Sequence, residues 1–436
     1  MLSQPRYLIP AVLYYKSRAY PMTDYDALLK QHQEFQARNL TLNMERGQPA
    51  DANFDLSLPI LSAVNETNYT TNNGVDIRNY PGGVLGLLEA RELFCEQINV
   101  APDELIIGNN SSLELMSRFL TWALLRGVKD SSKGWFNDSP KLIVTAPGYD
   151  RHYLLARELG YELVTVKMTG TGPDIDAVEK LVANDSSVKG IYFVPTYSNP
   201  TGETISQASA EKLINIKAAA ADFTIFADDA YAVHHLEDNP PPAPNLLQIA
   251  KDNGKQDRVI IFGSTSKVTF ASGGIGLAGM SVENLKYWSK AMSVQTIGPN
   301  KSEQWRHVLF LRDFPGGLKG LMQEHAKILK PKFDKVQEIL NRELGNLNLA
   351  TWTDPRGGYF VSLDTAQPVA SRVVELAKEA GLALTPTGAT YPDGTDPEDR
   401  NIRLAPTRPP IEEVELAMEI VACCIKLATA EAAQNS

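Results

Sequence analysis

Two spacings of apolar residues alternate along this chain, most regularly between residues 84 and 262. Amphipathic stretches with apolar positions three and four residues apart predict helices, and short apolar runs between them predict buried strands. The expected helices are 87–98, 111–126, 152–159, 174–182 and 208–221, and the expected strands are 104–108, 141–146, 161–167, 190–194, 223–227 and 259–262. Strands and helices that alternate over this length are typical of an α/β fold with a mostly parallel sheet.

The rest of the chain predicts one more strand in this sheet and a smaller C-terminal part. Residues 276–281 follow the strand 259–262 too closely for a helical crossover, so we expect this seventh strand to be antiparallel to it. Further helices are expected at 283–294, 302–312, 318–344 with a kink near Pro331, 371–380 and 411–430, and further strands at 359–363 and 402–404. We therefore expect a large domain at 56–316, and a smaller α/β domain made of 1–55 and 317–436.

Composition excludes several classes of protein. The chain has 436 residues, more than one hydrophobic core usually supports, and its net charge of −10 without a basic block argues against nucleic acid as a partner. The three cysteines have no paired spacing and are expected to be reduced core thiols, and the histidines show no metal-ligand spacing. No run reaches 18 apolar residues, so we expect no membrane partner and a cytoplasmic protein that binds small molecules.

Candidate chemistry gathers where strands end, because the carboxyl ends of parallel strands share one edge of the sheet. Asn110, Ser111 and Ser112 follow the strand 104–108 and begin a helix, whose free N–H groups could hold a phosphate. Ser111 and Glu114 also have the spacing of a capping box, which would explain the serines without any ligand. Both interpretations remain open at this point.

Three later turns carry an aromatic ring, an amide and a carboxylate. Tyr149 lies in a turn that starts with Pro147, and Asn199 precedes a proline in the turn after the strand 190–194. Asp228 ends a fully apolar strand and is followed three residues later by Tyr231. A carboxylate at the end of such a strand is costly unless it pairs with a cation, such as a protonated ring nitrogen.

Lys267 follows the apolar strand 259–262 and has Ser264 and Ser266 before it. A lysine held partly out of water at a strand end can be nucleophilic and form a Schiff base. A surface lysine in a polar turn is the plainer alternative. The Ser-x-x-Lys spacing also matches β-lactamases, but those enzymes need Ser-Asp-Asn and Lys-Thr-Gly, which this sequence lacks.

In chain order, this combination of motifs resembles the class I aminotransferases of fold type I, which use pyridoxal 5'-phosphate (PLP), and in particular a divergent bacterial branch of aspartate aminotransferases. The resemblance runs from about Gly47 to Arg403. It implies that Lys267 holds PLP as an internal aldimine and moves the proton between Cα and C4'. It also implies that Asp228 keeps the pyridine nitrogen protonated, which makes the ring an electron sink.

The resemblance assigns further roles around the cofactor. Tyr231 and Asn199 match the residues that hydrogen-bond the ring O3', and Tyr149 matches the ring that stacks on PLP. His152 matches the residue that supports the aspartate. The residues implied in binding the phosphate are Asn110, Ser111, Ser112, Ser264 and, from the neighbouring subunit, Tyr80, and Ser266 is also implied in binding the cofactor. A tyrosine that reaches the neighbouring subunit implies a homodimer with shared active sites.

For the substrate, the resemblance implies that Arg403 binds the α-carboxylate and that Gly47 offers its backbone N–H to the same group. Two positions depart from the family pattern. Ile275 stands where the family usually has a phosphate-binding arginine, so either neutral donors suffice or Lys301 or Arg78 substitutes. Residues 294–301 hold no clear match for the arginine that binds the side-chain carboxylate in other aspartate aminotransferases.

The function that follows is transfer of an amino group between aspartate or glutamate and a 2-oxo acid through pyridoxamine phosphate. An aminotransferase for aromatic or neutral amino acids is the first alternative, and other PLP chemistry, as in a decarboxylase or a β-lyase, is also open. An effector-sensing transcription regulator on the same fold is the second alternative. That class carries an added basic winged-helix domain of about 60 to 70 residues, for which the residues before Gly47 are too few.

Overall fold

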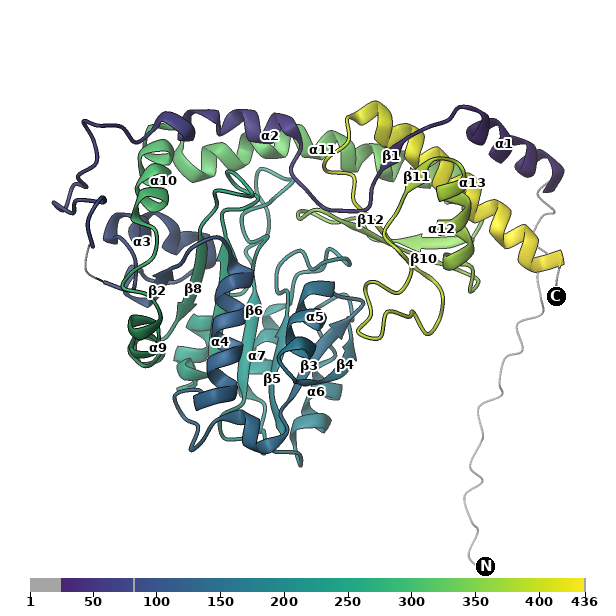
Figure 1. Cartoon of the computed structure of the whole chain (residues 1–436). Coiled ribbons are helices and arrows are strands. Elements are labelled where there is room, and N and C mark those ends of the chain that lie inside the picture. Colours follow the sequence, from purple (N-terminus) through teal and green to yellow (C-terminus); the bar gives the residue numbers. More distant parts are fainter. Residues whose placement is uncertain (1–24, 81–82, 435–436) are drawn as a thin grey trace, which may run out of the picture.

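A seven-stranded sheet forms the middle layer of the larger part of the structure, a computed structural model that describes residues 25–80 and 83–434 (Figure 1). The strands are arranged in the order β2-β8-β7-β6-β5-β3-β4. Their bounds are β2 (Leu105–Ile107), β3 (Lys141–Ala146), β4 (Glu162–Lys167), β5 (Val188–Phe193), β6 (Thr224–Asp228), β7 (Val259–Ser264) and β8 (Gly276–Met280). β8 is antiparallel to both of its neighbours and the other pairs are parallel, as the sequence predicted.

Helices cover both faces of this sheet. Successive side chains of a strand point to opposite faces, so Ile225 joins one hydrophobic core and Phe226 joins the other. One face packs against α4 (Ser112–Arg126), α5 (Asp150–Glu158) and α9 (Val282–Gln295), and the other against α3 (Leu88–Phe94), α6 (Ile175–Val182), α7 (Gln207–Asn215), α8 (Leu246–Asp252) and α10 (Lys301–Asp313). We call this part the sheet body.

A second core surrounds a three-stranded antiparallel sheet with the order β12-β10-β9, and we call this part the C-terminal body. Its elements are β9 (Ala350–Trp352), β10 (Val361–Thr365), β12 (Asn401–Leu404), α12 (Ala370–Glu379), α13 (Ile411–Gln434), α1 (Tyr25–Ala37), and the parallel pair β1 (Leu42–Asn43) and β11 (Leu382–Ala383). The helix α11 (Gly317–Leu344) joins the two bodies, because Leu321 lies in the sheet-body core and Phe333 in the C-terminal core (Figure 1).

Short elements complete the described chain. They are α2 (Asp51–Leu56) and the 3-10 turns η1 (Leu58–Ser62), η2 (Cys95–Ile98), η3 (Pro102–Glu104), η4 (Trp135–Asp138) and η5 (Gln256–Arg258). None of the helices within residues 25–80 and 83–434 is long and apolar enough to cross a membrane. Cys95, Cys423 and Cys424 are buried and free, as expected of core thiols.

The expected helix 208–221 is too long: α7 ends at Asn215, because Ile216 is extended and the amide of Ala219 bonds to the carbonyl of Val182. Residues 239–244 are rich in proline, a composition that predicts a surface insertion between residues 236 and 257, and the structure forms the helix α8 within this stretch. α11 runs through Pro331 as one helix, and the kink there stays a prediction. The domain limits also stay predictions, and residues 1–24 of the smaller domain lie outside the described residues.

Candidate active site between the two bodies

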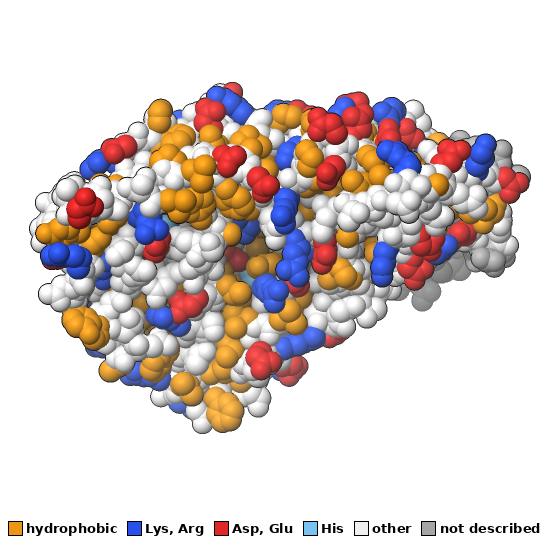
Figure 2. All heavy atoms as spheres, turned by 45° about the horizontal axis from the view of Figure 1, so that its top comes forward, with side chains coloured by type: hydrophobic (Ala, Val, Ile, Leu, Met, Phe, Trp, Pro, Cys, Tyr) orange, Lys and Arg blue, Asp and Glu red, His pale blue; other side chains and the backbone are white. Residues whose placement is uncertain are grey.

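The turns after β5, β6 and β7 meet the C-terminal body, and most of the sequence-predicted residues lie at this junction. Arg403 on β12 bonds to Asn199 in the turn after β5, and the ring of Tyr231 after β6 packs against Phe360. Figure 2 shows a hollow near the centre of one face of the molecule, with Lys and Arg side chains along its rim. A positive rim favours the entry of anionic ligands.

Asp228 is the carboxylate at the centre of this junction, and only 3% of its surface is exposed. Its Oδ2 lies 2.9 Å from Nε2 of His152, whose ring stacks on Tyr192 with centroids 3.7 Å apart. Its other oxygen, Oδ1, is buried and has no hydrogen-bond partner among the described residues. A buried carboxylate oxygen without a partner is costly, so the site is suited to a donor or cation at this atom.

Lys267 lies on the other side of Tyr231, with Nζ 5.0 Å from the centre of the tyrosine ring. Burial lowers the pKa of Lys267, and the nearby charge of Asp228 opposes this shift without reversing it. A lowered pKa leaves more of the amine neutral and therefore nucleophilic. Burial also raises the pKa of Tyr231 far above its usual value, so its phenol stays a hydrogen-bond donor.

Hydroxyl and amide groups before Lys267 form a small polar cradle at the start of α4. The hydroxyls of Ser264 and Ser266 lie 2.8 Å apart, and Ser266 Oγ donates to Oδ1 of Asn110 at 3.3 Å. A side chain at Gly274 would place its Cβ 2.9 Å from both N and Oγ of Ser266, so this approach requires a glycine. The cradle offers neutral hydrogen-bond donors only.

The expected capping box at the start of α4 is wrong. Ser111 is the N-cap residue, but its side chain makes no capping hydrogen bond, and Glu114 pairs instead with Arg118, one turn further along. An opposite charge four residues away on the same helix face competes with the cap for the carboxylate. The hydroxyl of Ser111 and the first N–H groups of α4 remain available to an anion, while Ser112 is buried.

Arg403 forms the opposite wall of the site and is 8% exposed. It donates to Oγ1 of Thr385 at 3.1 Å and to Oδ1 of Asn199 at 3.3 Å, and its guanidinium carbon lies 5.0 Å from the centre of the Phe360 ring. Burial lowers the pKa of Arg403, and no carboxylate of the described residues forms a salt bridge with it. A buried guanidinium without a carboxylate is suited to bind one from a ligand.

Gly47 makes this wall possible through its size. A Cβ at this position would lie 2.4 Å from Cζ of Phe360, so any larger residue would push the aromatic ring away from its place under Arg403. The sequence predicted a role for the backbone N–H of Gly47. The packing adds a second reason for glycine, the close approach of a ring.

Two of the predicted site residues, Tyr149 and Tyr80, are more exposed than the residues around Asp228 and Arg403. Tyr149 is half-buried with its ring centre 5.2 Å from that of His152, and its pKa is raised to about 12 by burial and by the charge of Asp228. Tyr80 is 78% exposed, so within one chain it does not join the cluster around Lys267.

Both cations considered for the phosphate have other partners within the chain. Arg78 forms an ion pair with Asp76 and stacks on Tyr69 at 3.7 Å, and Ile275 is fully packed in the core. Lys301 is buried and donates to two backbone carbonyls, which lie 3.3 and 3.4 Å from its amine. Neither cation contacts the cradle.

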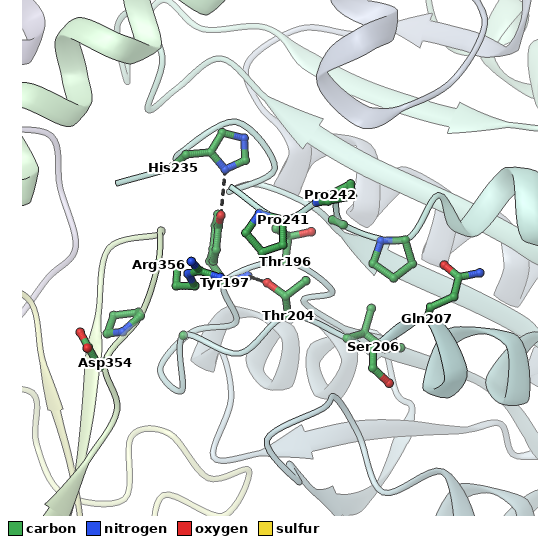
Figure 3. Close-up of a pocket in the computed structure, with 15 residues that line it drawn as sticks. Thr196, Tyr197, Thr204, Ser206, Gln207, His235, Pro241, Pro242, Asp354 and Arg356 are labelled. Atoms are coloured by element: carbon green, nitrogen blue, oxygen red, sulfur yellow. Dashed lines mark hydrogen bonds between the residues drawn. The ribbon is translucent and has the colours of Figure 1, made fainter. Parts of the chain in front are cut away.

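Sequence reasoning missed Tyr359, Phe360 and Thr385, which surround Tyr231 and Arg403 but carry no motif of their own. It also missed the support behind the Asn199 turn, where the hydroxyl of Tyr197 lies 2.8 Å from Nδ1 of His235 (Figure 3). A pocket of about 320 Å³ opens there, lined in part by prolines of the proline-rich insertion. The adjacent Tyr359 and Phe360 could have been noticed as aromatic residues after two glycines.

Comparison with known proteins points to one family. The family described as "Aspartate amino-transferase" matches residues 21–436. A protein of Mycolicibacterium smegmatis is 43% identical over 93% of this chain and 97% of its own length, and an aspartate aminotransferase of Corynebacterium glutamicum is 40% identical over 93% and 94%.

Solved structures agree with these sequence matches. The crystal structure of an aspartate transaminase from Corynebacterium glutamicum covers 94% of this chain and 96% of that chain, with a TM-score of 0.90 and 40% identity. LysN of Thermus thermophilus, an α-aminoadipate aminotransferase complexed with N-(5'-phosphopyridoxyl)-L-leucine, covers 93% and 95%, with a TM-score of 0.73 and 20% identity, and shares the fold.

Proposed function

This chain belongs to the aspartate aminotransferase family and is an aminotransferase, and we propose that it transfers the amino group between aspartate or glutamate and a 2-oxo acid with PLP as its cofactor. The observation that carries the proposal is that Lys267, 5.0 Å from the ring of Tyr231, lies close enough to the buried carboxylate of Asp228 for its charge to act on the amine. An effector-sensing regulator is not favoured, because the relatives that match over nearly the whole chain include a named aspartate aminotransferase.

The residues present fit PLP. The unpartnered Oδ1 of Asp228 can accept a hydrogen bond from a protonated ring nitrogen. The side-chain amide of Asn110 is engaged with the carbonyls of Ala271 and Ser272. The donors left for a phosphate are therefore the hydroxyls of Ser264 and Ser266, after rotation, and the free N–H groups at the start of α4. When bound, PLP supplies an aldehyde that condenses with an amine and a cationic ring that withdraws electrons from the substrate Cα.

The side chains around the ring would then bind and orient it. His152 holds Asp228 in place and leaves one carboxylate oxygen for the ring nitrogen, and Tyr231 offers its phenol proton to the ring O3' together with the amide of Asn199. Tyr149, whose ring lies beside that of His152, would stack on the cofactor ring. The Nζ of Lys267 would accept the proton from the substrate Cα, which its lowered pKa favours.

The substrate α-carboxylate would bind to Arg403. Its guanidinium is buried, held by Thr385 and Asn199, and lacks a carboxylate partner, so a bidentate interaction with a ligand carboxylate is available. The backbone N–H of Gly47 would complete this site. The contact between Arg403 and Asn199 links the substrate to the cofactor, since the amide of Asn199 is also the proposed donor to the ring.

The phosphate would be held without a cationic side chain. The isoleucine at 275 contributes its backbone amide to the loop rather than a charge to the ligand, and the free donors of Ser111 and the α4 N-terminus take the place of an arginine. Neutral donors bind a dianion less tightly than a guanidinium does. We therefore expect this chain to release PLP more readily in phosphate buffer than relatives that have the arginine.

A homodimer with shared sites is part of the same proposal. Leu58 and Leu61 in η1, Tyr80, and Val294 and Ile297 before α10 are exposed, and η1 packs against α10. Large apolar side chains that are exposed in one chain can be covered by another subunit. The dimer would bring Tyr80 to the phosphate of its partner.

Two further predictions complete the proposal. The chain divides into a large domain at 56–316 and a smaller domain made of 1–55 and 317–436, and the protein is located in the cytoplasm.

Absorbance spectroscopy and a substrate panel test this function. The purified protein with PLP should show the visible band of bound cofactor, and aspartate should bleach it, because the amino group passes to the cofactor. The return reaction should be fastest with oxaloacetate or 2-oxoglutarate and slower with pyruvate and phenylpyruvate. Equal rates with all four would contradict the aspartate assignment, and no spectral change with any amino acid would contradict PLP-dependent transamination.

A further inference from the structure

A buried histidine, His307 on α10, lies directly behind the segment that carries Lys267. Its side chain is 0% exposed. Its Nδ1 lies 2.7 Å from the carbonyl oxygen of Glu303, which can only accept, so Nδ1 carries the ring proton. Nε2 is therefore an acceptor, and it lies 3.1 Å from Oγ1 of Thr265 and 2.9 Å from Oγ1 of Thr269.

The direction of these hydrogen bonds follows from their neighbours. The amide of Ile275 donates to Oγ1 of Thr265 at 2.9 Å, so the hydroxyl proton of Thr265 is left to donate to His307 Nε2. The hydroxyl of Thr269 can donate either to Nε2 or to the carbonyl of Thr265, which lies 3.3 Å away. A continuous series of hydrogen bonds thus runs from the amide of Ile275 through the hydroxyl of Thr265 and the ring of His307 to the carbonyl of Glu303 on α10.

The two threonines frame Lys267. The amides of Val268 and Thr269 both bond to the carbonyl of Thr265, so residues 265–269 form one tight turn with Lys267 in its middle. On the other side of the turn, the carbonyl of Lys267 accepts from the hydroxyl of Tyr359 at 3.4 Å and lies 3.3 Å from Nε2 of His234. The backbone of Lys267 is therefore fixed from two sides.

We propose that His307 is a positioning residue for Lys267, acting through Thr265 and Ile275. This inference rests on the proposed function, since it assigns His307 to the reaction at Lys267. The neutral imidazole fixes the turn before the lysine and the loop that ends at Ile275. Where the family usually places an arginine at 275, this chain places a buried isoleucine whose amide joins the same network. Loss of the acceptor at Nε2 would leave the buried hydroxyl proton of Thr265 without an acceptor and loosen the turn.

The test compares His307→Phe, Thr265→Val and the double variant, all loaded with PLP. His307→Phe fills the space but removes the acceptor. We expect the midpoint of the pH titration of the bound-cofactor absorbance to move by about one unit and kcat to fall about tenfold, with KM nearly unchanged. Because His307 and Thr265 act through the same hydrogen bond, the double variant should shift the titration midpoint no further than either single variant does.

Two further variants separate positioning from general destabilisation. His307→Gln keeps an acceptor oxygen and should restore most of the normal titration midpoint. His32→Phe removes a similarly buried histidine that bonds to the carbonyl of Leu376 in the C-terminal body, and it should leave the midpoint unchanged. Thr265→Val is the smaller change and serves as the test if His307→Phe fails to fold.

Hydrogen exchange of the full chain without PLP gives a second readout that does not depend on activity. In His307→Phe the amide of Ile275 should exchange faster, because its acceptor Thr265 is no longer held. An unchanged midpoint together with unchanged exchange at Ile275 would overturn the inference. If the wild-type chain binds no PLP, the proposed function fails instead, and exchange at Ile275 still decides whether His307 holds the turn.

Discussion

The two walls of the candidate site are built in different ways. The wall that faces the proposed cofactor comes from strand ends of one sheet: Asp228 ends β6, Ser264 ends β7, and Lys267 follows in the next turn. The wall that faces the proposed substrate comes from four distant segments, which contribute Glu45 to Gly47, Phe360, Thr385 and Arg403. One sheet sets the first wall, and the packing of the C-terminal body sets the second.

This difference separates the roles of the two walls. His152 and Asp228 are held inside the sheet body, whereas Lys267 follows β7 of the same sheet and its carbonyl also accepts from Tyr359 of the C-terminal body. Arg403 reaches the cofactor wall through one hydrogen bond, to Asn199 at 3.3 Å. Changes on the cofactor wall should therefore alter kcat, and changes on the substrate wall should mainly alter KM.

Lys267→Ala should have the largest effect, because it removes the nucleophile and the proton acceptor of the cofactor wall at once. We expect transamination to fall at least about 1,000-fold, with loss of the visible absorbance of covalently held cofactor. Steady-state kinetics and an absorbance scan measure both. A variant that kept the normal spectrum would break the assignment of Lys267.

Arg403→Lys should lower kcat/KM by about 100-fold, mainly through KM, because an ammonium cannot replace a bidentate guanidinium. Arg408→Lys is the matched control, since Arg408 is exposed and bonds to the side chain of Gln48. Kinetics with aspartate as the varied substrate measure the effect. Equal effects at both positions would contradict the placing of the α-carboxylate at Arg403.

His152→Phe should lower kcat about tenfold and change KM little. Phenylalanine can keep the stacking on Tyr192 but cannot bond to Oδ2 of Asp228, so both oxygens of Asp228 would lack a protein partner. The kcat and KM of the purified variant measure this change. A rise in KM with normal kcat would contradict the expectation that changes on the cofactor wall alter kcat.

Asp229→Asn should have the smallest effect on activity and a pH-dependent effect on stability. Burial and the neighbouring charge of Asp228 raise the pKa of Asp229 to about 7, above its unfolded value of 3.8. The folded state then binds more protons than the unfolded state, so stability falls as pH rises between these values, by about 1.4 kcal/mol per unit, and levels off above about 7.

The variant removes this dependence, so its Tm should exceed that of the wild type by more at pH 8 than at pH 5. Thermal melts at both values measure the difference. The same gain at both values would show that Asp229 does not titrate in this range. Asp252→Asn, an exposed change in α8, is the control for a lost surface charge.

Most residues of the cofactor wall could be predicted because they directly follow strands, and an apolar run in the sequence marks where each strand ends. The same logic failed at Ser111 and Glu114, where a side-chain pair along the helix replaced the expected cap. It also failed at residues 216–221, where a hydrogen bond to a distant helix end displaced a continuing α-helix. In both places the competing partner was absent from the local pattern.

The amino-acid sequence by itself determined the mostly parallel sheet, the antiparallel strand after Lys267 and the set of residues at the strand ends, because these depend on hydrophobic period and on connection length. Only the tertiary structure decided that Phe360 packs on Gly47, that Thr385 and Asn199 hold Arg403, and that His307 supports the turn of Lys267. Those contacts join residues far apart in the chain, and no local pattern records which distant surfaces will meet.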